Sequence, residues 1–378
     1  MKMPFVYGHL PVKQEFTDRQ EEMTRLINNF QSQVNMVLIS PRRWGKSTLV
    51  LRAVEKAVKD DKKLRTCIID MYNIRNEEEF YSVFAKEILK STTTKANEII
   101  KTAGDFFKRI IPNISFSAGG DAEFKVNFDI ERLKTEPDEI LDLAENIAKA
   151  KNLKFVVCVD EFQNINEFDE PLQFQKKLRS HWQKHQNVSY CLYGSKRHMM
   201  SNIFANSSMP FYKFGDLMFL QKISRDDWVK FIKKRFRQTG KSINAKNAGL
   251  IAELTECHSY YVQQLAQQTW LRAEEVASEE LVRDAHNSII LQLSMLFQNL
   301  TDSLSNTQVY FLNAMINGVV HFNSQNVIKD YKLGSSANVT VIKRALVKKE
   351  IIDGFEGKFI ILDPMYKHWL ANFYFNTF

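Results

Sequence analysis

The sequence predicts a three-layer α/β domain built on a parallel sheet, followed by a helical region and a small C-terminal domain. Short, almost wholly apolar runs alternate with amphipathic helical patterns over the first ~220 residues, as expected for strands buried on both faces of a parallel sheet. After residue 224 the pattern turns helical, and the chain ends in three helical segments and a tight hairpin. The apolar runs are NMVLIS (35–40), LRTCIIDMY (64–72), FVVCVDEF (155–162), VSYCLYGS (188–195) and LMFLQKI (217–223).

The composition fits a globular protein and excludes several other classes. With 44% apolar and 25% charged residues, the 378-residue chain can bury a sizeable core in two or three domains. No run approaches the ~18 apolar residues of a membrane span, and the first residues lack the apolar stretch of a secretory signal. The four cysteines show no C-x-x-C spacing, which argues against a zinc site and favours a reduced, cytoplasmic location.

We expect three domains along the chain. Residues 1–223 form the α/β domain, 224–304 a helical lid and connecting helix, and 305–378 a winged helix, whose outline is three helices and a hairpin. Within the first domain, roughly 95–135 is too long for a single crossover and is predicted to be an insertion. Its segment NISFSAGGDAEFKVNFD predicts a β-hairpin around Gly119-Gly120.

The segment LISPRRWGKSTLV (38–50) nearly matches the phosphate-binding loop pattern G-x-x-x-x-G-K-[ST]. A strand precedes it and a helix follows it, as the motif requires. Gly45 lets the backbone close on phosphates, Lys46 would reach the β and γ phosphates, and the Ser47 hydroxyl would bind Mg²⁺. The residues predicted to contact a nucleotide here are Pro41, Arg42, Arg43, Trp44, Gly45, Lys46, Ser47 and Thr48.

Ser40 stands where the motif has its first glycine. Because this position is the start of the loop, a small residue such as serine can turn there. We therefore expect Ser40→Gly to change ATP affinity little and Lys46→Ala to abolish it. The alternative is that the segment is only a basic strand–helix turn.

Two further strands end in polar residues that suit phosphate chemistry. Asp160 and Glu161 follow one apolar run, and carboxylates at the carboxyl edge of a parallel sheet lie where such sheets bind ligands. Asp160 would hold Mg²⁺, and Glu161 would polarise the attacking water. Ser195 ends the next run and could sense the γ phosphate or orient the water. Each of these strand ends could by itself be an ordinary solvated terminus.

With these motifs in order, the chain resembles the AAA+ superfamily. More narrowly, it is similar to the STAND-related archaeal-type ATPases, which share their layout with origin-recognition ATPases. The resemblance implies that ATP and Mg²⁺ bind between the α/β domain and a helical lid. The segments that carry it are MPFVYGHLPVKQEFTDRQEEMTRL (with Phe16, Arg19 and Glu22), SPRRWGKSTL, VVCVDEFQNI, CLYGSKRHMM, ECHSYYVQQLA and FIILDPMYKHWL.

The lid segment departs from the family pattern. Cys257 and Ser259 occupy positions where the family tends to have Gly and Pro. His258 between them could contact a phosphate, or it could be a helix-capping residue without a ligand. The sequence does not identify the arginine finger, which the family supplies from a neighbouring subunit or domain. Its candidates are Arg179, Arg197 and Lys213.

The third helix of a winged helix can lie in the DNA major groove. Between residues 306 and 350, six Lys and Arg stand against two acids, and the whole chain carries a net charge of +8, which also fits a lysine-rich surface without such a partner. The predicted core face of the third helix is Val339, Ile342 and Leu346. The residues predicted to face double-stranded DNA are Asn338, Thr340, Lys343 and Lys348. Winged helices also bind proteins, so a protein partner is an alternative to DNA.

These features together predict a nucleotide-controlled switch with ATPase activity that couples to DNA or protein binding. One alternative is a DNA-binding protein whose nucleotide site is degenerate, with Ser40 as the first sign. Another is a protein-interaction scaffold that uses the hairpin near 114–130. The sequence leaves the biological process and the oligomeric state open.

Overall fold

The computed structural model describes residues 3–8, 19–92, 115–118, 124–127, 138–355 and 358–375. The chain divides into two compact units. The α/β unit is Arg19–Gln221, and the helical unit combines Met1–Asp18 with Lys222–Phe378.

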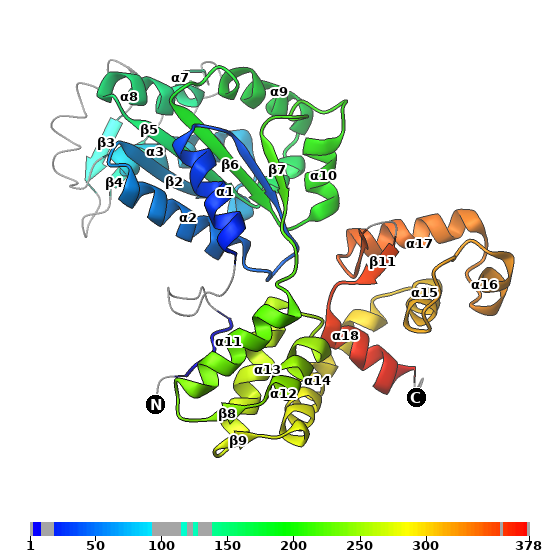
Figure 1. Ribbon diagram of the computed structural model, residues 1–378. Helices are drawn as coiled ribbons and strands as arrows, with labels where there is room; N and C mark the ends of the chain where they lie inside the picture. The colour runs from blue at the N-terminus through cyan, green and yellow to red at the C-terminus, as the bar shows by residue number, and fades with distance from the viewer. Residues whose placement is uncertain are drawn as a thin grey trace. The chain divides into compact units, whose positions relative to one another are not determined.

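Five parallel strands form the sheet of the α/β unit (Figure 1). They are β1 (Met36–Ile39), β2 (Leu64–Asp70), β5 (Lys154–Asp160), β6 (Val188–Gly194) and β7 (Asp216–Phe219). Their order in the sheet is β2-β5-β6-β1-β7, so the strand that precedes the predicted phosphate loop lies inside the sheet. This arrangement confirms the predicted fold class. The predicted strands are present, and each ends earlier than its apolar run, by one or two residues in β1, β2, β5 and β6 and by four in β7.

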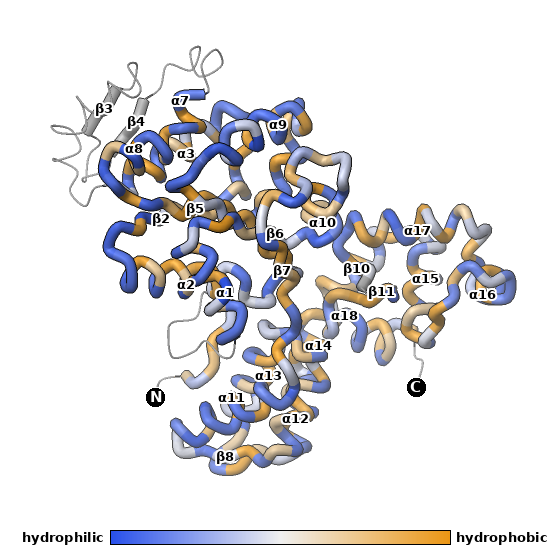
Figure 2. Tube along the Cα trace, turned by 45° about the horizontal axis from the view of Figure 1, so that its top comes forward, coloured by the Kyte–Doolittle hydropathy of each residue, from blue (hydrophilic) through white to orange (hydrophobic). Residues whose placement is uncertain are grey.

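Helices cover both faces of this sheet (Figure 1). Because alternate residues of a strand point to opposite faces, each strand contributes to both layers of core. Figure 2 shows the strands as predominantly apolar segments. The helices are α1 (Gln20–Gln31), α2 (Lys46–Asp60), α3 (Glu77–Thr92), α7 (Asp138–Leu141), α8 (Leu143–Lys151), α9 (Pro171–Trp182) and α10 (Arg197–Ala205), with 3₁₀ turns η2 (Met71–Asn73) and η5 (Phe162–Glu167).

The predicted insertion is described only in two short strands. β3 (Ser115–Ala118) pairs antiparallel with β4 (Phe124–Asn127), as a hairpin in this segment requires. Gly119-Gly120 and the remainder of the predicted insertion lie outside the described residues.

The helical unit begins with a bundle and ends with the winged helix. In the winged helix, three helices are followed by an antiparallel hairpin, which confirms the prediction. Among the described helices, none is both long and apolar enough to cross a membrane. The elements are α11 (Arg225–Arg237), β8 (Ser242–Ile243), α12 (Ala245–Leu254), α13 (Ser259–Arg272), β9 (Val276–Ala277), α14 (Glu279–Asp302), α15 (Asn306–Ile316), α16 (Gln325–Asp330), α17 (Ser336–Lys348), β10 (Ile352–Phe355), β11 (Lys358–Ile361), α18 (Pro364–Trp369) and a π-helical turn (Leu370–Tyr374).

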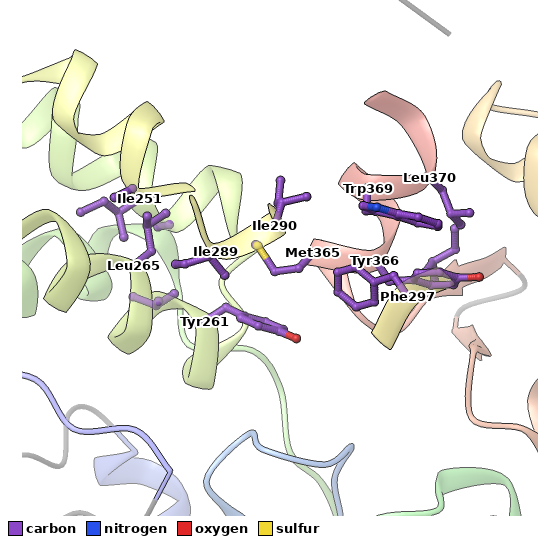
Figure 3. Close-up of a cluster of buried hydrophobic side chains, with 14 of the residues drawn as sticks. Ile251, Tyr261, Leu265, Ile289, Ile290, Phe297, Met365, Tyr366, Trp369 and Leu370 are labelled. Atoms are coloured by element: carbon purple, nitrogen blue, oxygen red, sulfur yellow. The ribbon is translucent and has the colours of Figure 1, made fainter. Parts of the chain in front are cut away.

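The long helix α14 joins the bundle to the winged helix through one continuous core (Figure 3). Ile289 and Ile290 are buried in its middle, and Met365 of α18 belongs to the same cluster. Further along, the ring of Phe297 packs 5.4 Å from that of Tyr366, centroid to centroid. The hydroxyl groups of Thr301 and Tyr366 hydrogen-bond at 2.8 Å. Because this core has no break, the predicted boundary near residue 304 does not separate two compact units.

The N-terminal segment belongs to the helical unit, whereas the sequence assigned it to the α/β domain. The ring of Phe5 is 2% exposed and packs against Phe231 and Phe236 of α11, with ring centroids 6.2 and 5.7 Å away. The guanidinium of Arg235 donates to the carbonyl oxygen of Pro4. The buried ring of Phe5 and the buried guanidinium of Arg235 therefore hold this segment on α11. The segment is too short to show a periodic sequence pattern from which this contact could be predicted.

A buried histidine gives the helical unit a pH-dependent stability. His286 of α14 lies with its ring 4.8 Å from that of His368 of α18, and its Nε2 has no hydrogen-bond partner. Burial lowers the pKa of His286 to about 4, and the charges of His368 and Arg283 act in the same direction. The unfolded chain, with a histidine pKa of about 6.5, then binds the proton more readily than the folded one.

We expect the free energy of unfolding to be highest above pH 6.5 and to fall as the pH is lowered toward 4. His286 should account for about 2 kcal/mol of the loss between pH 7 and pH 5. Chemical denaturation at both pH values should show that His286→Leu removes this part of the loss. His321→Leu, which changes an exposed histidine of the same unit, is the control. Equal losses in wild type and His286→Leu would contradict this account.

Candidate active site

Three strand ends meet at the carboxyl edge of the sheet. β6 lies between β5 and β1, so Asp160, Gly194 and Ile39 end three adjacent strands. Gly194 and Ile39 are paired in register, and the amide of Ser40 donates to the carbonyl oxygen of Gly194 at 3.3 Å. The structure thus brings together the three strand ends that the sequence singled out.

The backbone of the loop after β1 requires glycine at one of its two motif positions. Gly45 has φ +93°, a left-handed conformation that side chains other than glycine rarely adopt. Ser40 is fully buried, has no positive φ, and its hydroxyl donates to the carbonyl oxygen of Pro41 at 3.1 Å. The start of the loop therefore accommodates serine without backbone strain.

Gly45 is also the N-cap of α2, and no side chain caps this helix end. The first amides of a helix have no acceptor within the helix, and the helix dipole adds positive potential there. This end of α2 is therefore suited to an anion. Of the predicted loop residues, Pro41, Trp44 and Thr48 are buried, whereas Arg42 and Arg43 are exposed.

The charge of Lys46 is buried between two carboxylates. Its side chain is only 9% exposed, and Nζ lies 2.7 Å from Oε1 of Glu161 and 3.1 Å from Oδ1 of Asp160. The hydroxyl of Ser47 donates to Oδ2 of Asp160 at 2.8 Å. Lys46, Ser47, Asp160 and Glu161, which we call the carboxylate–lysine cluster, therefore form a single network across two strand ends.

The carboxylate of Glu161 is held from both sides. Oε1 faces Lys46, and Oε2 accepts from the hydroxyl of Ser195 at 2.8 Å, its amide at 3.2 Å and Nε2 of Gln163 at 2.5 Å. Burial raises the pKa of Glu161, but the Lys46 charge and these hydrogen bonds outweigh burial and lower the pKa to about 2. For Asp160 burial dominates and raises the pKa, although Lys46 and Ser47 oppose it.

Sequence reasoning assigned no role to two residues at this site. Gln163 lies two residues after Glu161 and reaches its carboxylate, and Tyr193 of β6 places its ring centroid 5.9 Å from Nζ of Lys46. Both belong to segments already noted for their strand ends. Gln163 belongs to the segment VVCVDEFQNI, which carries part of the family resemblance, but that resemblance assigned it no role, and nothing in the sequence pointed to Tyr193.

His258 belongs to the helical unit, at the N-cap of α13. It is 7% exposed, its side chain makes no capping hydrogen bond, and its ring lies 5.0 Å from that of Tyr261. The contact with a phosphate stays a prediction. The local backbone explains why the family tends to have Gly and Pro beside it. Cys257 has φ +56°, which glycine adopts freely, and Ser259 is the first residue of α13, where proline is favoured.

The candidates for an arginine finger occupy different surroundings. The guanidinium of Arg179 lies 4.9 Å over the ring of Phe214, and burial lowers its pKa. That of Arg197 lies 5.9 Å over the ring of Phe219. Lys213 is exposed and has a positive φ. None of these contacts identifies a finger.

In α17 the predicted core face is correct, whereas the predicted DNA contacts stay predictions, and two of the residues concerned are half-buried. Nζ of Lys343 lies 4.9 Å over Phe359 and 5.2 Å over Phe322, and burial lowers its pKa. Nδ2 of Asn338 donates to the carbonyl oxygen of Leu333 at 2.7 Å. Both side chains thus contact their own domain. The residues that are exposed on α17 include Thr340, Val341, Arg344 and Lys348.

Comparisons with known proteins agree with this architecture. Residues 16–265 match the family described as an ATPase domain predominantly from Archaea, and residues 295–372 match a probable winged helix domain. A Walker-type ATPase of Pyrococcus abyssi is similar at 17% identity over 98% of this chain and 99% of that one, with a TM-score of 0.65. ORC2 of Aeropyrum pernix, in ADPNP-ADP complexes, is similar at 15% identity over 98% and 97%, with a TM-score of 0.58. No curated protein matches.

The backbone conformation of the loop predicts different effects for substitutions at its two motif positions, Ser40 and Gly45. Ser40→Gly should change nucleotide affinity less than about threefold, because the serine has an ordinary conformation and lies at the start of the loop. Gly45→Ala should weaken it about 5- to 30-fold, because a side chain in the left-handed region costs roughly 1–2 kcal/mol. Calorimetric titration with ATP would measure both. The reverse ranking would show that the loop does not bind nucleotide through this geometry.

Proposed function

The chain belongs to the family of ATPase domains found predominantly in Archaea, and from this premise we propose that it binds ATP with Mg²⁺ and hydrolyses it. The observation that carries the proposal is the carboxylate–lysine cluster. It joins a lysine, a hydroxyl and two carboxylates at the N-terminus of α2 and the end of β5. The likeness to ORC2, whose structure was solved with ADPNP and ADP, supports the fold of such a site.

The residues present fit a magnesium nucleotide. The hydroxyl of Ser47 and the carboxylate of Asp160, 2.8 Å apart, are oxygen donors of the kind that Mg²⁺ binds. The uncapped N-terminus of α2 at Gly45 suits a phosphate chain. Bound Mg²⁺ would neutralise charge on the phosphates during transfer.

Each residue of the cluster then has a distinct task. Lys46 exchanges its contacts with the carboxylates for phosphate oxygens, so a bound nucleotide replaces the counter-charge that the carboxylates supply in this structure. Glu161 orients and polarises the attacking water, and Ser195 holds the carboxylate of Glu161. Because Nζ of Lys46 donates to Oε1 of Glu161, turning the lysine to the phosphates frees a lone pair of this oxygen for the attacking water.

We further propose that nucleotide state controls binding of a partner by the winged helix. Duplex DNA is the partner that the basic face of α17 favours, and Arg344 and Lys348 are the cations on its exposed side. The competing function is a binding protein or scaffold with a degenerate, non-hydrolysing site. The intact carboxylate–lysine cluster favours the ATPase, and turnover measured with and without DNA separates the two.

Substitutions in the carboxylate–lysine cluster should separate effects on the rate of ATP hydrolysis from effects on ATP affinity. Glu161→Gln should lower kcat at least about 100-fold, because the group that polarises water is lost. It should retain or improve ATP affinity, because a neutral side chain competes less for Lys46. Lys46→Ala should abolish measurable ATP binding, because the charged hydrogen bonds to the phosphates are lost.

Steady-state turnover and equilibrium binding of ATP and ADP measure the two effects independently. Lys56→Ala, which removes an exposed lysine from the outer part of α2, is the control and should change neither. Absence of turnover in the wild-type protein, with ATP affinity that is unaffected by Lys46→Ala, would refute the proposed ATPase.

The exposed face of α17 allows a paired test of DNA binding. Arg344→Gln should weaken binding to duplex DNA and reduce the slope of log affinity against log salt by about 0.9, the value for one lost phosphate contact. Lys343→Gln should leave the slope unchanged, because this lysine packs on Phe322 and Phe359. If the wild-type protein shows no salt-dependent binding to duplex DNA, the winged helix acts on a protein partner instead.

A further inference from the structure

The amide of Gln163 is enclosed beside the carboxylate of Glu161. Gln163 lies in η5, is 1% exposed, and its Nε2 donates to Oε2 of Glu161 at 2.5 Å. Its own Oε1 is buried without a hydrogen-bond partner. A buried acceptor without a partner costs free energy, so stability alone does not account for glutamine at this position.

Gly194 makes the room for this amide. A Cβ atom built on Gly194 would lie 1.9 Å from Oε1 of Gln163 and 2.7 Å from Sδ of Met200. The backbone of Gly194 is not in the left-handed region, so its φ does not require glycine. The absence of a side chain at the end of β6 is therefore needed for space, and the occupant of that space is the glutamine amide.

The orientation of the amide follows from its neighbours. If it were reversed, Oε1 would face the carboxylate of Glu161 and repel it, so the NH₂ group must point to Glu161 and Oε1 must face Gly194. The hydroxyl and the amide of Ser195 donate to the same Oε2 of Glu161. Three donors thus bind one carboxylate oxygen and leave the other for Lys46.

We propose that Gln163 and Gly194 act as a positioning pair that fixes the carboxylate of Glu161 for catalysis. The inference rests on the proposed ATPase function and adds two residues to it. Neither residue touches substrate: Gln163 acts through Glu161, and Gly194 acts through Gln163. The carbonyl oxygen of Gly194 also accepts a hydrogen bond from the backbone amide of Ser40. Gly194 therefore connects the start of the phosphate loop to the residues that hold the carboxylate of Glu161.

Steady-state ATP turnover by the full chain tests the pair. Gln163→Met keeps the volume of the side chain but removes the donor, and it should lower kcat about 10- to 100-fold with KM within about threefold. Gly194→Ala should lower kcat by a similar factor because its Cβ displaces the amide. Gln163→Ala opens that space, so the double variant Gln163→Ala/Gly194→Ala should be no slower than Gln163→Ala alone.

Gln175→Ala is the matched control. Gln175 in α9 is also 1% exposed, donates to Asn166 at 3.0 Å and has a buried Oε1 without a partner, but it contacts no residue of the carboxylate–lysine cluster in the described hydrogen bonds. It should leave kcat unchanged. If it lowers kcat as much as Gln163→Met, the effect of Gln163 is one of general packing and the inference is wrong.

The remaining outcomes distinguish failure of the positioning role of Gln163 and Gly194 from failure of the proposed ATPase function. Wild-type turnover with unchanged kcat in Gln163→Met overturns the positioning role and leaves the ATPase in place. Effects of Gln163→Ala and Gly194→Ala that multiply in the double variant overturn the pairing. No turnover in the wild type, under conditions where it binds ATP, overturns the ATPase and the inference with it. If Gly194→Ala does not fold, Gln163→Met still decides whether Gln163 positions Glu161.

Discussion

The buried ammonium group of Lys46 is the constraint on which the site depends. A cation that is only 9% exposed needs counter-charge, and Asp160 and Glu161 supply it within 3.1 Å. The two carboxylates in turn need donors, which Ser47, Gln163 and Ser195 provide. From one charge, therefore, a network extends over the ends of three strands and fixes the side chains that surround the N-terminus of α2.

The sheet makes this network possible by separating apolar from polar residues along each strand. β5 and β6 are almost wholly buried over their length, and their first polar side chains in the site come where the strands end. Parallel strands bring these ends to one edge, so residues that are 115 positions apart, Lys46 and Glu161, meet at 2.7 Å. The order of the strands places β6 between them and brings in Ser195.

Much of this could be predicted because it depends on period and position. Buried parallel strands have an apolar pattern that a single sequence shows, and their ends show where polar groups gather. The hydrogen bond from Gln163 could not be predicted, because it depends on the turn after β5, where Glu161 adopts φ +50°. The contact of Phe5 with α11 could not be predicted either, since it joins residues more than 200 positions apart through a short segment.

The helical period explains where Lys343 lies on α17. Lys343 lies four residues after Val339 and three before Leu346, so it borders the buried stripe of the helix, and its long side chain can cross the rings of Phe322 and Phe359. Arg344 lies on the opposite side of the helix. In the sequence prediction Lys343 lies on the outer face of α17, whereas the helical period places it beside the core face and places Arg344 opposite that face.

Stability gives no reason for the carboxylate–lysine cluster. Buried ion pairs lose so much hydration that apolar residues of similar volume are often equally or more stabilising. Glu161 adds a left-handed backbone, and Gln163 adds an acceptor without a partner, both of which cost free energy. Such costs at one edge of an otherwise apolar sheet are typical of a site shaped by a ligand. A degenerate site would have no need to retain them, which is why we favour an active ATPase over a scaffold.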